Sequence, residues 1–428
     1  MLEFNALFLR RGLYRYDAFG TSRGWLTLAY LLQGRYKKDW ISAYEHALVE
    51  HSGASHAISF AAGRLALCAI LEALGIGEGD EVILPAFTCA AVANAIVDHG
   101  AKPVYVDIGE GTFNIDVTKI ERAISPRTRA ILAQHTFGQP CEIEAVMGIA
   151  RSRNILVIED CAHAFGASFG GRKLGTFGEA AFASTDSTKV FSTSHGGFAL
   201  CASRQLADKI RLIQKRSSDL PGHMKLTIFA QHGLMGVLML PSVYWASKIF
   251  IALLGRMNLW FHCYDNLKAA RPGLPPANLT NFQAFVGWNE VQALSSNTSR
   301  RRGVAARYHR ILLDSSKDFA DGASLCYSVL VATPAKWEKS LGKHFRVGHW
   351  FSSFAQGRKD DWESIQYVPG SCPVAEYSSS HVINFPTHAL IGTDALERFR
   401  VLVSESGLKQ DILPVGRTGE SSLAGGGQ

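Results

Sequence analysis

The sequence predicts an α/β fold, with a mostly parallel sheet in a large domain and a small α+β domain after it. Short apolar runs alternate with helical stretches between residues 56 and 215, as in strands joined by crossover helices. Small and polar residues follow several of these runs, at the strand ends where such sheets place their ligands. From about residue 280, a long helical pattern precedes only two strand-like stretches, 324–333 and 381–388, which indicates a smaller, separate unit.

The individual elements follow from the same patterns. Apolar runs predict strands at 56–61, 80–85, 102–108, 129–135, 156–160, 180–185 and 196–203. Helical periodicity predicts helices at 64–74, 90–100 and 143–154, one long or two tandem helices over 281–313, and a closing helix at 393–406.

The domain organisation is expected to have four parts. An N-terminal arm and the large domain occupy 1–225, an apolar insertion with a Pro-rich connector occupies 226–277, the small domain 278–415, and a disordered tail 416–428.

The insertion contains an unusually apolar stretch, 226–262. No charged residue occurs between Lys225 and Lys248, and Pro241 divides the stretch into two pieces. Each piece is shorter than the roughly 20 residues that a spanning helix needs. Three interpretations stay open: a buried helical pair or dimer contact, a peripheral membrane patch, and a true span.

Composition and charge exclude several classes of protein. The net charge of +7 is spread along the chain, so nucleic-acid binding is not predicted; the cluster 300–302 favours a solvated helix face over an anion site. The eight cysteines show no CxxC pair and no zinc spacing, which favours reduced thiols in the cytoplasm and no metal site. Arg10, Arg11 and Arg15 interrupt any apolar core of a signal peptide.

Two strand ends carry residues suited to binding an anion and a cation. Gly63 and Arg64 open a helix after the first strand, where free N–H groups and the helix dipole favour a phosphate, although such turns are common in α/β proteins. The strand 156–160 runs into Glu159 and Asp160 and then His163. A carboxylate at the end of a buried strand is costly unless it is paired, and a metal ligand or a helix N-cap is the alternative.

Two further strand ends supply a lysine and an aromatic residue. Lys189 follows a buried strand among hydroxyl residues and precedes a glycine pair. A desolvated lysine amine can form an imine with an aldehyde, and the alternative is a phosphate-binding or exposed lysine. Phe87 and Cys89 follow another strand, and Phe87 could cover a flat cofactor or belong to the core. A lysine imine with an acidic partner for a ring nitrogen is the minimal equipment for pyridoxal phosphate.

Residues 40–215 resemble the DegT-like family of fold type I aminotransferases. The matching strings, in the family's order, are 73–88, 100–108, 112–116, 124–132, 138–140, 157–167 and the STK that ends at Lys189; 279–294 resembles a later family helix. The resemblance implies a large domain with a seven-stranded-type sheet, the cofactor pyridoxal phosphate, glutamate as amino donor and a nucleotide-linked keto sugar as acceptor. It also implies a homodimer whose sites are completed by the neighbouring subunit.

The resemblance also assigns roles to individual residues. Lys189 forms the Schiff base with the cofactor and moves protons, Asp160 pairs with the ring nitrogen, and His163 lies beside the ring. Gly63, Arg64 and Ser184 match phosphate-binding positions.

Three departures from the family pattern concern the cofactor and the substrate. Cys89 occupies the position of the ring-covering aromatic, and Asn278 is a substitute, two positions away, for the asparagine that reaches the partner's phosphate. The region 340–390 resembles the family poorly. Two alternatives therefore stay beside transamination: a sugar dehydratase, although related dehydratases carry histidine in place of Lys189, and a cofactor-binding regulator or scaffold without turnover.

Overall fold

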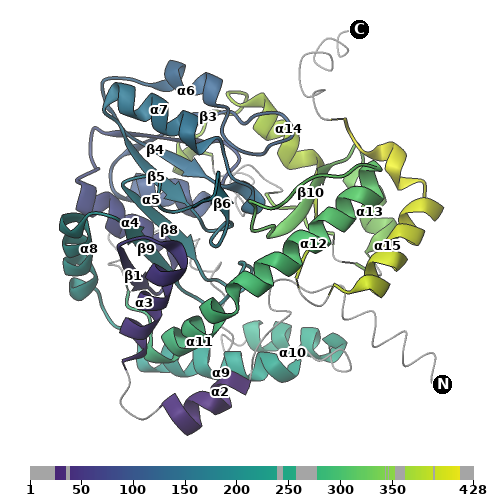
Figure 1. Ribbon diagram of the computed structural model, residues 1–428, viewed down its shortest axis with the longest axis horizontal. Helices are drawn as coiled ribbons and strands as arrows, with labels where there is room; N and C mark the ends of the chain where they lie inside the picture. Colours follow the sequence, from purple (N-terminus) through teal and green to yellow (C-terminus); the bar gives the residue numbers. More distant parts are fainter. Residues whose placement is uncertain are drawn as a thin grey trace.

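The computed structural model describes residues 25–34, 39–238, 244–256, 277–342, 344–345, 347–351, 362–388 and 391–414. Its large domain is built on a seven-stranded sheet with the order β1-β9-β8-β5-β4-β2-β3 (Figure 1). The strands are β1 (His56–Phe60), β2 (Glu81–Pro85), β3 (Lys102–Val106), β4 (Thr128–Gln134), β5 (Leu156–Asp160), β8 (Ala180–Ser184) and β9 (Gly197–Cys201). Within this sheet β9 alone runs against the others, because both β1 and β8 pair with it antiparallel. The prediction of a mostly parallel sheet is confirmed.

Helices cover both faces of the sheet, which explains the continuous apolar runs of its strands. All five residues of β2 are buried, and so are all five of β9. One apolar core joins the sheet to α4 (Gly63–Leu74), α5 (Ala90–Asp98) and α8 (Arg204–Arg216). The other joins it to α3 (Trp40–Ser52), α6 (Val117–Ala123), α7 (Ile143–Arg153) and α11 (Asn281–Gln292). Of these helices, α3, α6 and α8 were not anticipated; α6 begins where the Asp116 side chain accepts a hydrogen bond from the Thr118 N–H.

The long helical pattern forms two tandem helices, α11 and α12 (Leu294–Leu313), which meet at Ala293. A capping box between Thr280 and Gln283 starts α11, which packs against α3 of the large domain. A separate core unites α12 with β10 (Cys326–Leu330), β11 (Val382–Pro386), α13 (Pro334–Leu341) and α15 (Thr393–Glu405). The expected α+β character of the small unit is therefore present, while the boundaries of the four expected parts remain predictions.

Two helices of this C-terminal part were not anticipated from the sequence. They are α13 and α14 (Pro373–His381), and both begin with a proline in the first turn. Proline suits that position because its missing N–H has no partner there in any case.

The apolar stretch forms two helices, α9 (Gly222–Leu238) and α10 (Tyr244–Arg256), and α9 packs on α2 (Trp25–Ala29). A five-residue π-helix, η2 (Tyr30–Gly34), continues α2. Figure 1 shows α2, α9 and α10 together along one side of the molecule, beside α11. None of the helices in the described ranges is both long and apolar enough to cross a bilayer. Pro241, the connector and the predicted tail lie outside the described residues.

Candidate active site

An anion cradle lies where α4 begins. Ala62 precedes the helix without a side-chain cap, so the first N–H groups of α4 have no intrahelical partner. A Cβ on Gly63 would lie 2.9 Å from the Ser184 Cβ, and one on Gly197 would lie 2.3 Å from the Gly63 nitrogen. Glycine is therefore required at both positions. Arg64 is the next residue of α4; its Nη1 atom is buried and has no hydrogen-bond partner among the described residues, which suits an anionic ligand.

Asp160 closes β5 as a buried carboxylate. Its Oδ1 atom accepts a hydrogen bond from the Ala162 N–H at 2.9 Å. Burial raises the pKa of Asp160 to about 6, although this N–H and the Lys189 charge favour the ionised form. The side chain is not the N-cap of a helix in the described fold, because a turn rather than a helix follows β5. A cationic partner, such as a protonated ring nitrogen, would restore the charged carboxylate.

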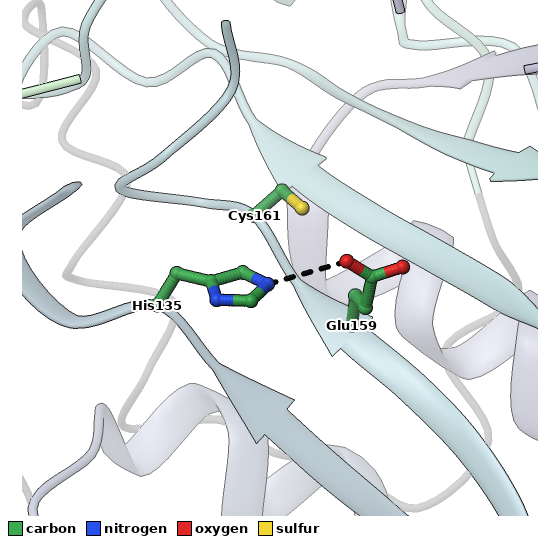
Figure 2. A group of neighbouring side chains, drawn as sticks. All are labelled: His135, Glu159 and Cys161. Carbon is green, nitrogen blue, oxygen red and sulfur yellow. Dashed lines mark hydrogen bonds and ion pairs between the residues drawn. The ribbon is translucent and has the colours of Figure 1, made fainter. Parts of the chain in front are cut away.

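The neighbouring Glu159 has a structural environment instead. Figure 2 shows the His135 ring directed at its carboxylate, with the Cys161 thiol nearby. The Cys141 N–H donates to His135 Nδ1 at 3.2 Å, which leaves the ring proton on Nε2 to bond Glu159 at 3.3 Å. Backbone N–H groups of residues 175, 177 and 178 also donate to Glu159.

These bonds hold the pKa of Glu159 below its usual range in spite of burial. His135, Glu159 and Cys161 place one potential ligand atom each within 4.8 Å of one another, which is compatible with a metal ion. The hydrogen bonds already use the lone pairs of His135 and Glu159 that an ion would need. The trio therefore serves to anchor the turn 175–178 against β5.

Lys189 lies half-buried in the turn after β8. Asp186 organises this turn: its backbone carbonyl accepts from the Lys189 N–H at 3.0 Å, and its carboxylate accepts from the Thr188 N–H at 3.2 Å. The other carboxylate oxygen of Asp186 faces His195 Nδ1 at 3.4 Å. Despite burial, the bond and charge of His195 and the charge of Lys189 lower the pKa of Asp186. The lysine is thus placed by a buried acidic turn, which its sequence pattern did not indicate.

Lys189 brings the predicted residues together electrostatically. Its charge acts on the side chains of Cys89, Asp160 and His163, which come from two other segments of the chain. Parallel strands end at the same edge of a sheet, so this convergence follows from the topology. The phosphate-binding candidates Gly63 and Ser184 meet at the same edge, because β1 and β8 flank β9.

His163 lies in an aromatic cluster. Its ring stacks on Phe137 and Phe351, at centroid distances of 6.1 and 5.7 Å, and lies 4.9 Å from the Trp350 ring. Burial, together with the Lys189 charge, holds the pKa of His163 well below its usual value. The neutral ring accepts a long hydrogen bond from the Phe137 N–H at Nδ1, 3.4 Å, so its proton lies on Nε2.

Trp350 is the residue that sequence patterns missed. Its ring lies 4.8 Å from Lys189 Nζ, within the range of a cation–π contact. The small domain holds it there: its N–H donates to Asn384 Oδ1, and Gly348 pairs with Asn384 through two backbone hydrogen bonds. No motif could have located Trp350, because it reaches the lysine only through the packing of β11 against the large domain.

Phe87, Cys89 and Asn278 were also expected to lie near the cofactor. Phe87 is fully buried among Phe113, Phe137 and Phe351, in the core position that was the alternative to covering a cofactor. Cys89 precedes α5, and burial raises the pKa of its thiol.

Asn278 follows Ala277, whose carbonyl accepts a hydrogen bond from the Ala61 N–H just before the cradle, and the Asn278 side chain bonds the segment before α9. Its amide donates weakly to Ser217 O and Asp219 Oδ1, each at 3.4 Å. Its expected role toward a partner's phosphate remains a prediction.

The chain is similar to known proteins over its N-terminal half and in its fold. Residues 30–236 match the model of the DegT/DnrJ/EryC1/StrS aminotransferase family. A GDP-perosamine synthase of Caulobacter vibrioides is 41% identical over 187 residues, which cover 42% of this chain and 50% of that protein. A UDP-N-acetyl-3-dehydro-alpha-D-glucosamine 3-aminotransferase of Acidithiobacillus ferrooxidans is 38% identical over 177 residues, 41% and 48% of the two chains. The match thus spans about half the length of these curated relatives.

Solved structures are similar over nearly the whole fold. An aminotransferase of the same family from Brucella abortus has a TM-score of 0.69 at 22% identity, covering 90% of this chain and 95% of that one. A putative sugar aminotransferase from Streptococcus pneumoniae, in its PLP form, has a TM-score of 0.71 at 17% identity, covering 94% and 99%. At such identities the likeness establishes the α/β fold with its seven-stranded sheet.

Proposed function

We propose that this chain is a pyridoxal-phosphate-dependent aminotransferase of the DegT/DnrJ/EryC1/StrS family, whose model matches residues 30–236. The amino donor is glutamate, and the acceptor is the keto group of a nucleotide-linked sugar. The observation that carries the proposal is the convergence of Lys189, Asp160 and the anion cradle at one edge of the sheet. The relatives named for amino-sugar synthesis support the acceptor class.

The residues at the site fit the cofactor's three recognisable parts. The start of α4, with Gly63, Ser184 and the unpartnered Arg64 nitrogen, would hold the phosphate. Asp160 would bind the ring nitrogen, because burial raises the pKa of this carboxyl and a cationic ring nitrogen would restore its charged form. Lys189 would supply the amine that reacts with the aldehyde.

The same residues would carry out the chemistry. When bound, pyridoxal phosphate supplies an electron sink for the carbon that gains or loses nitrogen. Lys189 Nζ, once free, holds and delivers the proton that moves at that carbon. Asp160 keeps a positive charge on its partner nitrogen, and His163 offers its Nε2–H as a neutral hydrogen-bond donor. The Trp350 ring stands over Nζ and separates it from water on that side.

The proposal is tested by loading the full chain with pyridoxal phosphate and adding glutamate. We expect the visible absorbance of the bound cofactor to shift. One molecule of 2-oxoglutarate should appear for each molecule of bound cofactor. A screen of UDP-, GDP- and dTDP-linked keto sugars should then identify an acceptor that restores the first spectrum and gains nitrogen by mass spectrometry. Release of water from the sugar without nitrogen gain would identify a dehydratase, and an unchanged spectrum with glutamate would identify a non-catalytic binder.

We further propose that two copies associate and share their sites, with Asn278 of each copy reaching the cradle of the other. Its support is the family resemblance. Sedimentation velocity gives the mass, and mixing inactive Lys189→Ala and Asn278→Ala chains tests the sharing. In the mixed dimer one site has both native residues, so activity should return. Two separate, unshared sites predict no return.

We also propose that the protein lies in the cytoplasm, at the inner face of a membrane. None of the described cysteines is paired in a disulfide, which is compatible with a reducing compartment. Fractionation of cells that express the full chain measures the share of protein that sediments with membranes. Recovery in a periplasmic fraction would contradict this location.

A further inference from the structure

Exposed apolar side chains gather on one side of the molecule. Ten of the fourteen large apolar side chains that are exposed in the described residues lie on α2, η2, α9 and α10. We call this set the apolar face; its members are Trp25, Leu28, Leu31, Leu32, Leu226, Leu234, Val237, Ile249, Phe250 and Leu253. Scattered exposed apolar residues are ordinary, whereas a gathered set indicates contact with another apolar surface.

The helices of this face are turned with their apolar side outward. Ile249, Phe250 and Leu253 share one side of α10, and Ile249 is 67% exposed, whereas Ser247, about 160° around the helix from Ile249, is buried. In α9 the exposed positions 226, 234 and 237 likewise fall on one side, because a helix repeats every ~3.6 residues. A water-facing helix would show the reverse arrangement.

A polar contact fixes the helices beneath the face. Thr27 of α2 and His232 of α9 are joined by a buried hydrogen bond of 3.0 Å, and α2 packs along α9. Burial lowers the pKa of His232 to about 4, so this ring is neutral at physiological pH. α2 and α9 are therefore held together by their inner sides, so the outward direction of their apolar side chains is a property of the folded chain.

The charges on these helices are all basic. Within 25–34, 222–238 and 244–256 the ionised residues are Lys225, Lys248 and Arg256, with no carboxylate. Arg256 is exposed at the end of α10, one turn from Leu253. Lys225 pairs with Asp219, just before α9, at 2.9 Å. Basic residues beside an exposed apolar stripe are the arrangement of helices that lie in the headgroup region of anionic bilayers.

A cleft of about 720 Å³ continues the apolar face toward the large domain. Tyr30, Leu226 and Phe229 line the cleft together with the basic residues Lys215 and Lys225. Leu226 belongs to both the cleft and the apolar face, so the two surfaces are continuous. The basic residues again stand next to apolar ones.

We propose that the apolar face binds the surface of an anionic lipid membrane, with α9 and α10 lying in the plane of the headgroups. Neither helix is long and apolar enough to cross a bilayer, so the contact is peripheral. The apolar side chains enter the acyl boundary while Arg256 and Lys225 stay at headgroup level. This inference goes beyond the proposed amino transfer and does not depend on it.

Cosedimentation of the full chain with vesicles tests the proposal. We expect binding to phosphatidylcholine vesicles that contain phosphatidylglycerol, weaker binding to phosphatidylcholine alone, and a decrease with added salt. The combined variant Ile249→Ser, Phe250→Ser and Leu253→Ser should lower the partition constant at least about tenfold. Arg256→Glu should reduce only the preference for the anionic vesicles.

A matched control replaces exposed apolar residues elsewhere. Val368→Ser with Val401→Ser removes apolar side chains outside the face and should leave vesicle binding unchanged. Circular dichroism melting of every variant verifies folding, and amino transfer in vesicle-free buffer should be the same as in the wild type. Failure of the wild type to sediment with either vesicle overturns the proposal. Conversion of the triple variant from dimer to monomer, by sedimentation velocity, overturns it in favour of a contact between copies.

Discussion

The candidate active site and the apolar face depart from ordinary burial in opposite directions. At the site a carboxylate, a histidine and an arginine nitrogen are buried, and the pKa of Asp160 rises to about 6. On the face, side chains such as Leu226 and Trp25 stand in water. Each arrangement costs free energy in the isolated chain. The comparison teaches that burial and exposure can each mark a binding region: a charged small molecule fits the first in our proposal, and an apolar surface fits the second.

The largest effect is expected at Lys189. Lys189→Ala removes the amine that holds the cofactor and moves the proton, so amino transfer should fall at least about 10³-fold. The cofactor's visible absorbance should change to that of the free aldehyde, while the melting temperature without cofactor stays near that of the wild type. Reduction of the loaded wild type with borohydride, followed by peptide mass spectrometry, should locate the cofactor on Lys189. A label on another lysine would contradict the assignment.

Asp160→Asn is expected to have the next largest effect. A neutral amide cannot favour a positive charge on the ring nitrogen, so kcat should fall by roughly 10²-fold while the cradle retains the phosphate. Equilibrium dialysis measures the occupancy, and stopped-flow absorbance measures the half-reaction with glutamate. Loss of cofactor in step with activity would show that Asp160 serves binding alone.

The same substitution should act in the opposite direction on the stability of the cofactor-free protein. The pKa of Asp160 is higher in the folded chain, about 6, than its usual value of 3.8, so folding favours the protonated form. Its contribution is fully present below pH 3.8 and is lost as the pH rises through about 6. Above that pH, Asp160→Asn should stabilise the cofactor-free chain by about 2–3 kcal/mol. Denaturant unfolding of both proteins at pH 4 and pH 7.5 checks this, and an equal difference at both pH values would contradict it.

Substitution of Trp350 should have a moderate effect on activity. Two different substitutions distinguish the loss of the side chain from the loss of its aromatic face. Its ring lies over Lys189 Nζ and against His163, so Trp350→Ala should lower kcat/KM by roughly 3–30-fold. Trp350→Phe keeps an aromatic face and should recover most of that loss. Kinetics with the identified acceptor provide the measurement, with Trp362→Ala, a half-buried tryptophan of the same small unit, as control. Equal losses in both alanine variants would assign Trp350 a structural role.

The smallest effect is expected on the apolar face. Exposed side chains make few folded contacts, so Ile249→Ser, Phe250→Ser and Leu253→Ser together should change the free energy of unfolding by less than about 1 kcal/mol. The variant should nevertheless stay soluble at higher concentration. A loss of several kcal/mol would mean that the helix packs these residues inward.

Sequence patterns sufficed for the sheet and for much of the site. Strand ends are local features, so Asp160 and Lys189 could be placed at one edge from chain order and the rules of parallel sheets. Trp350 could not be placed, because its position depends on packing between β11 and the large domain. The acidic turn around Asp186 was not predicted for another reason: a buried Asp–His pair has no characteristic spacing in sequence.

The apolar stretch shows a second limit. Its composition indicated two short helices, and α9 and α10 are present, but composition does not tell an inward side from an outward one. The exposed Ile249 and the buried Ser247 reveal the orientation only in three dimensions. No sequence pattern indicated that the residues of α2 and η2 belong to the apolar face, because they join it through contact with α9.

The reversed strand β9 has a consequence for the order in which the protein can mature. β9 is the last strand of the large sheet in the chain, yet it lies between β1, the first, and β8. Gly197 of β9 closes the cradle against Gly63. During synthesis on the ribosome, β1 therefore remains without its partner strand β9 until more than 130 further residues have emerged. The phosphate pocket forms only when the sheet closes, so cofactor capture would mark a completed large domain and hold it shut by mass action.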